Sequence, residues 1–237
     1  TIVFGFVVLA LIPTMLWLLG TDRRASGSEA RMAGNPAPPR VRIRKALLRD
    51  PRFYALVPAA LVLPFVMTGL FLYQLELAHV KGWSEMIMAS AFMGFAAGRV
   101  TLSLAAGPWV DRLGASRLYP AYLLPLGLAI LGVAVLSASW VPVACFFLAG
   151  ATQGIGGVVK SALWAEVYGT EFLGTVRSLI TSLMVFATAS SPAAFGWLLD
   201  QGFSVSGVLL GTLFPILASM VSAWWTCNGL SKGLRGT

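Results

Sequence analysis

The sequence predicts an all-α membrane protein. Hydrophobic residues make up 57% of the 237 residues and charged residues only 11%, whereas a soluble globular domain carries about 25% charged residues. The apolar residues are also gathered into runs of about 20, the length that an α-helix needs to cross a bilayer. A soluble fold could not bury this much apolar surface, so we expect lipid to be the solvent.

Seven apolar runs have the length of a spanning helix, at residues 1–20, 53–78, 85–106, 119–137, 142–165, 178–199 and 207–228. The first run begins at Thr1, without the charged start and the cleavage site that a signal peptide has. We therefore interpret residues 1–20 as the last helix of an upstream part, and the chain as a fragment of a longer protein.

The long polar segment 21–52 sets the expected orientation in the membrane. It contains nine Lys and Arg residues against three acidic ones, and it is rich in Gly, Ser and Pro. Because Lys and Arg are enriched in cytoplasmic loops, we expect a cytoplasmic linker that is flexible at its start. From Val41 to Arg52 apolar and basic residues alternate at helical spacing, which is typical of a helix on the membrane surface. The net charge of +8 then follows from topology and does not indicate nucleic acid.

The remaining loops alternate in charge, as the same rule requires. Loops with little positive charge are expected on the external side, at 79–84, 138–141 and 200–206. Basic residues place three further segments in the cytoplasm, namely 107–118, 166–177 and the tail 229–237. The predicted location is the inner (plasma) membrane, crossed several times, with a cytoplasmic C-terminus.

The loop 107–118 contains a spaced pattern of glycine and charge. A Gly is followed after three residues by Asp-Arg, then after one residue by a second Gly and a further basic residue, at Gly107, Asp111, Arg112, Gly114 and Arg117. This pattern resembles the signature loop of the major facilitator superfamily of secondary transporters. Ala115 departs from it, because a basic residue is usual straight after the second Gly.

Two residues of this loop have a direct physical interpretation. We expect Asp111 to accept hydrogen bonds from the free N–H groups at the start of helix 119–137, and Gly114 to permit a turn that a side chain would block. The resemblance implies that the loop governs conformational exchange and does not bind substrate. A plain solvated turn is the alternative.

A second stretch, 162–178, resembles the cytoplasmic link between helices ten and eleven in bacterial members of the family. It places Glu166 and Arg177 to form ion pairs at the inner gate, with Arg112 as a further partner. The alternative is surface charges of little energetic weight.

The resemblance implies an architecture for the whole chain. Residues 53–228 would be the six-helix C-terminal half, built from two inverted three-helix repeats, 53–137 and 142–228. The linker 21–52 would join it to helix 1–20, the last helix of an N-terminal half. The helices expected to line the central cavity are 53–78, 85–106, 142–165 and 178–199.

Arg99 is the first candidate for substrate contact, because ionisable groups at membrane depth are costly and usually face a cavity or a partner. Gly94, Gly98 and Ser103 are expected to share its face and to let a neighbouring helix come close. In anion-carrying members of the family an arginine on helix eight binds the substrate carboxylate, and Arg99 is the candidate match. The alternative is a side chain that snorkels to the headgroups.

Helix 142–165 carries a polar face of small residues, which suits a water-filled cavity. Its members are Gln153, Gly156, Gly157, Lys160 and Trp164. Lys160 and Gln153 are therefore candidates for the cavity wall, with snorkelling as the alternative for Lys160.

Further candidates lie on two other helices. Thr181 belongs to a stripe of hydroxyls on helix 178–199, which either lines the cavity or makes interhelical hydrogen bonds. Tyr73 and Glu76 lie near the outer end of helix 53–78, and a partly buried Glu76 is a candidate for proton coupling. Simple solvation is the alternative for Glu76. Three GxxxG spacings are interpreted as packing only: Gly94/Gly98, Gly150/Gly154 and Gly207/Gly211.

These residues predict a secondary transporter that works by alternating access. A small organic anion is the expected substrate, since Arg99 and Lys160 outnumber Glu76; a drug or amphiphile exporter is the alternative. From another class, a non-transporting receptor or a membrane-embedded enzyme remains open. His79 is the only histidine and no P-loop exists, so we expect no enzymatic activity, metal or cofactor. The expected partners are the substrate, the bilayer, the N-terminal half and protons.

Overall fold

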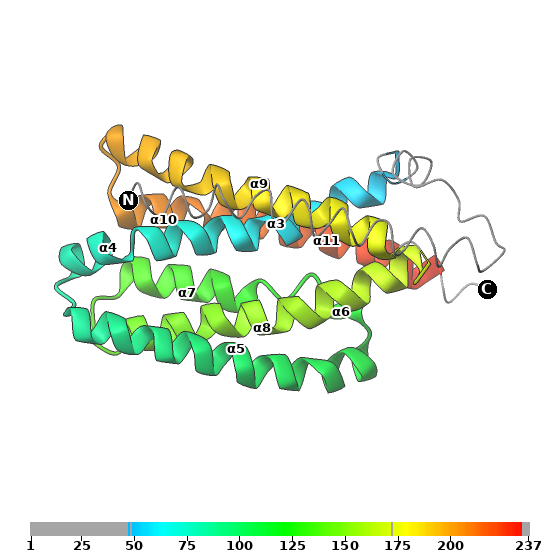
Figure 1. Cartoon of the computed structure of the whole chain (residues 1–237), viewed down its shortest axis with the longest axis horizontal. Helices are drawn as coiled ribbons and strands as arrows, with labels where there is room; N and C mark the ends of the chain where they lie inside the picture. Colours follow the sequence, from blue (N-terminus) through cyan, green and yellow to red (C-terminus); the bar gives the residue numbers. More distant parts are fainter. Residues whose placement is uncertain (1–46, 48, 172, 234–237) are drawn as a thin grey trace, which may run out of the picture. The chain divides into compact units, whose positions relative to one another are not determined.

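The structure, a computed structural model, describes residues 47, 49–171 and 173–233 (Figure 1). The predicted helix 1–20, the linker 21–52 except for its last residues, and the end of the tail 229–237 lie outside the described residues. In the described part every regular element is an α-helix.

Five helical stretches are long and apolar enough to cross a membrane, which agrees with the predicted all-α class and indicates a multi-pass membrane protein. They are α3 (Pro51–Leu72), α5 (Glu85–Leu113), α8 (Val141–Tyr168), α9 (Leu173–Asp200) and Val205–Gly229, which holds α10 (Val205–Gly211) and most of α11 (Leu213–Gly233).

The first described span consists of two helices. α3 begins after Asp50, whose carboxylate accepts the backbone N–H of Arg52 at 2.9 Å and caps the helix. α3 ends one residue before Tyr73, and α4 (Gln74–Lys81) follows directly. The predicted single helix 53–78 is therefore interrupted at Tyr73.

The second span extends beyond its predicted end. The expected helix 85–106 stops before Gly107 and Pro108, but α5 includes both residues and continues to Leu113. It ends at Gly114, whose φ of 83° lies in the region that favours glycine. The turn expected at Gly114 is thus confirmed, and a short helix, α6 (Ala115–Leu118), follows it.

The third span is shorter than predicted. Instead of a helix over 119–137, α7 covers Leu124–Val135. Residues 119–123 form turns, with bonds such as that from the N–H of Leu124 to the carbonyl of Ala121 at 3.0 Å. Pro120 has no N–H for a regular helical bond, which favours these turns. A helix of 12 residues is about 18 Å long, less than the ~30 Å hydrocarbon core.

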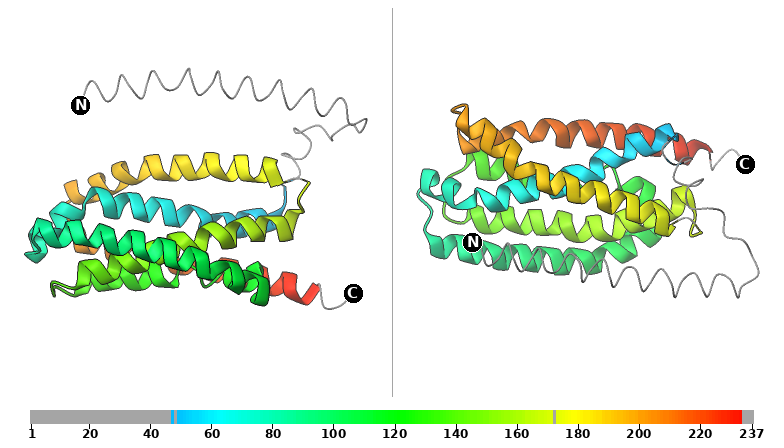
Figure 2. Two further views of the ribbon diagram at one scale, coloured as in Figure 1. Left: turned by 60° about the horizontal axis from the view of Figure 1, so that its bottom comes forward. Right: turned by 45° about the horizontal axis from the view of Figure 1, so that its top comes forward.

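The helices pack in two principal pairs, visible side by side in Figures 1 and 2. α5 packs along α8, and α3 packs along α9. α7 lies against α8, α10 lies against α7, and α11 lies against α3. The most apolar stretches of α3 and α8 are 50% and 56% buried, against 17% for α5 and 22% for α9. α3 and α8 are therefore the inner helices, and α5 and α9 flank them.

Glycines allow the backbones of α5 and α8 to touch. A Cβ at Gly94 would lie 2.7 Å from the carbonyl oxygen of Val143, and one at Gly98 would collide with the carbonyl of Phe147. Cβ atoms at Gly150 or Gly154 would in turn collide with the backbone of α5. This confirms the packing predicted for two GxxxG pairs. At the third pair, a Cβ on Gly211 would meet nothing within 4 Å.

Candidate functional site

The turn after α5 is held by a carboxylate from another part of the chain. Oε1 of Glu166 accepts the backbone N–H of Ala115 at 2.9 Å, and Oε2 accepts that of Ser116 at 3.2 Å. Glu166 therefore caps the start of α6, whereas the sequence predicts that Asp111 accepts the free N–H groups at the start of a helix over 119–137. That prediction is wrong because α5 extends through Asp111, which leaves its exposed side chain in the last helical turn, before the N-terminus of α6.

The basic residues of the signature loop do not join this contact. Arg112, Arg117 and Arg177 are all exposed. None of them pairs with Glu166 in the part of the chain that the structure describes. The structure thus brings together the two stretches that contain the predicted gate, but the link is a carboxylate on backbone N–H groups instead of an ion pair.

Two buried tyrosines behind this turn were not among the predicted site residues. The hydroxyl of Tyr119 donates to the carbonyl of Leu56 at 2.8 Å, and that of Tyr122 donates to the carbonyl of Ala59. Trp164 packs edge-on to Tyr119, with 6.3 Å between ring centroids. The signal in the sequence that could have found them is a tyrosine within an apolar run, because its buried hydroxyl needs a hydrogen-bond partner.

Lys81 and Trp83 tie the opposite end of the bundle together, and the sequence did not reveal this either. The Lys81 ammonium donates to the carbonyl of Ala134 at 2.7 Å, near the end of α7. The Trp83 indole N–H donates to the carbonyl of Ser137 at 2.9 Å. A cation at a helix C-terminus is favourable because the last carbonyls have no partner within the helix.

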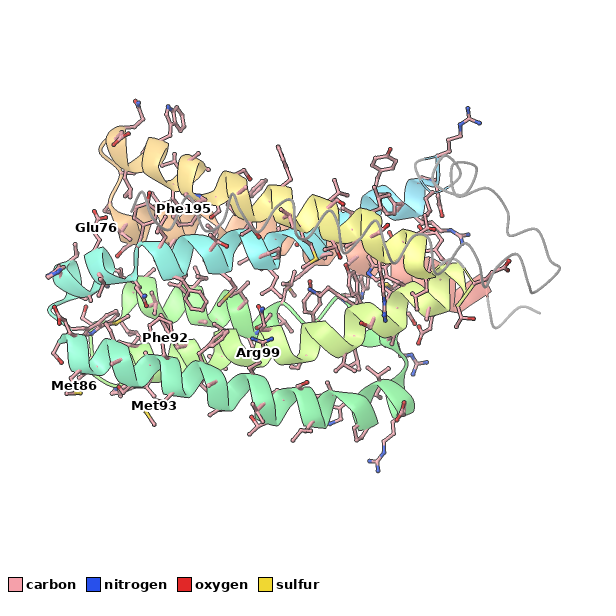
Figure 3. All side chains as sticks on the ribbon, in the orientation of Figure 1. Glu76, Met86, Phe92, Met93, Arg99 and Phe195 are labelled. Carbon is pink, nitrogen blue, oxygen red and sulfur yellow. The ribbon has the colours of Figure 1, made fainter. Side chains whose placement is uncertain are left out.

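Arg99 lies near the middle of α5 (Figure 3). Its backbone takes part in the close contact with α8, where a Cβ on Gly150 would lie 3.0 Å from the Arg99 nitrogen. Its side chain is exposed, whereas Gly98 is buried against α8. Gly94, Gly98 and the backbone of Arg99 all lie at the contact with α8, while the Arg99 side chain is exposed. The guanidinium has no hydrogen-bond or ion-pair partner among the described residues.

The polar face predicted on α8 is only partly realised. Gln153 and Lys160 are half-buried, and Gly157 between them is exposed. Gly156 is buried, since a Cβ there would lie 2.8 Å from the Tyr122 ring, and Trp164 belongs to the aromatic packing described above. The stripe available to a cavity therefore consists of Gln153, Gly157 and Lys160.

Tyr73 serves in packing between two helices. Its hydroxyl donates to the carbonyl of Pro192 on α9 at 3.3 Å, and its ring stacks on Phe195 with 5.8 Å between centroids. Glu76 is exposed in the first turn of α4, at the end of the bundle (Figure 3). Figure 3 places Glu76 at this end of the bundle and Arg99 in mid-span, so the structure separates these two candidates.

The hydroxyls of α9 differ in their hydrogen bonds, and Ser191 makes the interhelical bond that was one of the two expected roles. Ser191 is buried and donates across the interface to the carbonyl of Phe65 at 2.7 Å. Ser182 donates to the carbonyl of Ser178 within its own helix. Thr181 is exposed and makes no hydrogen bond with other described residues, so its hydroxyl is available to a ligand.

Among the described residues, no group of three His, Cys, Asp or Glu side chains could hold a metal ion. The predicted cavity residues within the spans are two cations, Arg99 and Lys160, an amide, Gln153, and a hydroxyl, Thr181. Comparison with known proteins adds no family, because no family model, curated protein or solved structure matches the chain.

Proposed function

We propose that the chain is the C-terminal half of a bacterial secondary transporter of the major facilitator type, which works by alternating access and carries a small organic anion. The proposal rests on one observation above all, the pattern of helix packing. It implies a second six-helix half as the partner of this one, and no catalytic chemistry.

The packing pattern is what two equivalent three-helix repeats would produce. The first repeat would hold α3–α4, α5 and α6–α7, and the second α8, α9 and α10–α11. In this scheme α3–α4 is equivalent to α8, α5 to α9, and α6–α7 to α10–α11. The pair α5–α8 then has its equivalent in the pair α9–α3, and the contact of α7 with α8 has its equivalent in the contact of α11 with α3. The contact of α7 with α10 is its own equivalent. Because α3 and α8 start at opposite ends of the bundle, the repeats are inverted, as in many transporters.

The charges at the two ends support the expected orientation. The exposed arginines Arg112, Arg117 and Arg177 lie at the end where α5 stops and α9 starts. Of the described residues at the other end of the bundle, only Lys81 is a Lys or Arg, and its ammonium is hydrogen-bonded to α7. The arginine-rich end is the cytoplasmic side in this proposal.

Arg99 supports an anionic substrate. A guanidinium in mid-span is costly to leave unpaired, and this one is exposed without a partner in the described chain. It can hold a carboxylate through two parallel hydrogen bonds. Lys160, half-buried on the inner helix α8, adds a second positive charge within the spans.

A drug or amphiphile exporter is the second candidate, on a different observation. α5 exposes Met86, Phe92 and Met93, which are labelled in Figure 3. Flexible thioether and aromatic side chains accept apolar ligands of varied shape. This candidate predicts transport of apolar cations or neutral amphiphiles that does not depend on Arg99.

The test is uptake by the full-length protein in proteoliposomes, with a panel of labelled mono- and dicarboxylates and amphiphiles. Removing a charge-assisted contact to a buried anion costs on the order of 2–5 kcal/mol, so Arg99→Ala should nearly abolish carboxylate uptake. Arg99→Lys, which keeps the charge but loses the paired hydrogen bonds, should retain part of it. Arg52→Ala is the matched control, because it removes an exposed arginine in the first turn of α3.

Uptake by Arg99→Ala equal to that of the parent would remove the main support for an anionic substrate. Amphiphile uptake without carboxylate uptake would select the second candidate.

A further inference from the structure

Arg99 shares one side of α5 with Phe92. The two residues are seven apart in the sequence, a spacing that returns to the same face of a helix after two turns. Figure 3 places both on the side of α5 that faces the other helices, whereas Met86 and Met93 lie on the opposite side. The exposed guanidinium of Arg99 and the ring of Phe92 are therefore open to the same space.

Phe92 belongs to a cluster of aromatic rings that come from three helices. The centroids of Phe71 on α3, Phe92 on α5 and Phe146 on α8 lie 5.6–5.9 Å from one another. Phe95, one turn before Arg99, adds a ring 5.2 Å from that of Phe71. Phe146 is buried, while Phe92 remains 41% exposed. The cluster is thus anchored in the bundle and still presents an aromatic surface, one to two turns before Arg99 on α5.

Lys160 lies at a different level of the bundle from Arg99. The glycine contacts give the register of α5 and α8, because a Cβ on Gly150 would lie 3.0 Å from the Arg99 nitrogen and one on Gly154 would collide with the Arg99 carbonyl. Lys160 follows these glycines by six to ten residues, which is about 9–15 Å along α8. The two carboxylates of a four-carbon dicarboxylate are only about 4 Å apart. Arg99 therefore meets one carboxylate by itself, which favours a monoanion.

We propose that Arg99 binds the carboxylate of an aromatic monocarboxylate, a molecule of the benzoate type, whose ring packs on the exposed part of the phenylalanine cluster. The inference rests on the proposed function, since it names the class of anion that the transporter carries. The rings of Phe95 and Phe92 lie about 6–10 Å before Arg99 along α5. A carboxylate hydrogen-bonded to the guanidinium, followed by its own ring at an aromatic contact distance of about 4.5–7 Å, spans that interval.

The experiment measures uptake by the full-length protein in proteoliposomes, with labelled benzoate, acetate and succinate. We expect a KM for benzoate about tenfold or more below that for acetate, because only benzoate gains the ring contact. Acetate or succinate taken up as well as benzoate would overturn the aromatic class, but the proposed function would stand if Arg99→Ala abolished that uptake. Absence of uptake of all carboxylates would contradict the proposed function and this inference together, so the two failures are distinguishable.

A pair of phenylalanine variants makes the test specific. Phe92→Ala removes the exposed ring and keeps Arg99, and it should raise the KM for benzoate about tenfold. Phe214→Ala is the matched control, because Phe214 is 79% exposed on α11, a helix that supplies no ring to the cluster, and it should leave the KM unchanged. An unchanged KM in Phe92→Ala, or an equal rise in both variants, would overturn the proposal. If Phe92→Ala does not fold, the comparison of benzoate with acetate in the parent still decides.

Discussion

Glu166 allows a direct test of the link between the two predicted gate stretches. Its carboxylate bonds the backbone N–H groups of Ala115 and Ser116, at 2.9 and 3.2 Å. Ala115 is 0% exposed, so leaving its backbone N–H without a hydrogen-bond acceptor is costly. Glu166→Ala removes both acceptors, and Glu166→Gln retains one neutral acceptor.

The size of the effect follows from these environments. A hydrogen bond to a charged group contributes roughly 1.5–3 kcal/mol. Because Glu166 is exposed and solvent screens it, we take about 1.5 kcal/mol for the bond to Ala115 and about 0.5 kcal/mol for the bond to Ser116. The sum of about 2 kcal/mol corresponds to a roughly 30-fold change in the opening equilibrium of the turn. For Glu166→Gln about 1 kcal/mol, or roughly fivefold, is expected.

Hydrogen–deuterium exchange of the peptide that covers 114–118 measures this opening directly. The Ala variant should exchange at Ala115 and Ser116 about 30-fold faster than the parent, with Gln in between. Glu171→Ala is the matched control, because Glu171 is also exposed near this end of the bundle and makes no hydrogen bond with other described residues. Unchanged exchange in Glu166→Ala, or equal acceleration in Glu171→Ala, would refute the capping role.

Three further predictions use other measurements. Gly98→Ala should lower stability by about 1–3 kcal/mol in thermal unfolding, because the added Cβ collides with α8. Gly107→Ala on the same helix is the control, since its Cβ has open space and should not lower stability. Equal effects of the two substitutions would contradict the close contact. Ser191→Ala should cost about 1 kcal/mol by the loss of a buried interhelical hydrogen bond, and no loss in denaturant unfolding would count against it. A thiol introduced at Gln201 should react with an impermeant reagent outside cells and one at Ser116 should not; the reverse would overturn the orientation.

The spans themselves could be predicted because hydropathy and helix length are local properties. The predicted runs 85–106 and 142–165 lie within α5 and α8. The ends were less predictable, since they depend on neighbours. α5 continues through Pro108, and the turns at 119–123 shorten α7.

Part of the candidate site was also visible in the sequence. The loop pattern identified Gly114, whose left-handed backbone is a local requirement. A second pattern, over 162–178, included Glu166, which bonds the two residues after Gly114. The sequence assigned the capping role to Asp111, which is near in sequence but on the wrong side of the turn. Tyr73 could not be told from a cavity residue until its contact with Pro192 was seen.

The sequence alone determined that this is a helical membrane protein, where its apolar helices run, and which ionisable groups lie within them. These follow from composition and from spacing along one helix. Only the tertiary structure decided that Glu166 caps α6, that Tyr119 and Tyr122 bond to α3, and that Arg99 is exposed. The reason is physical: a hydrogen bond between segments some 50 or more residues apart depends on where packing places their backbones, and no local pattern encodes that distance.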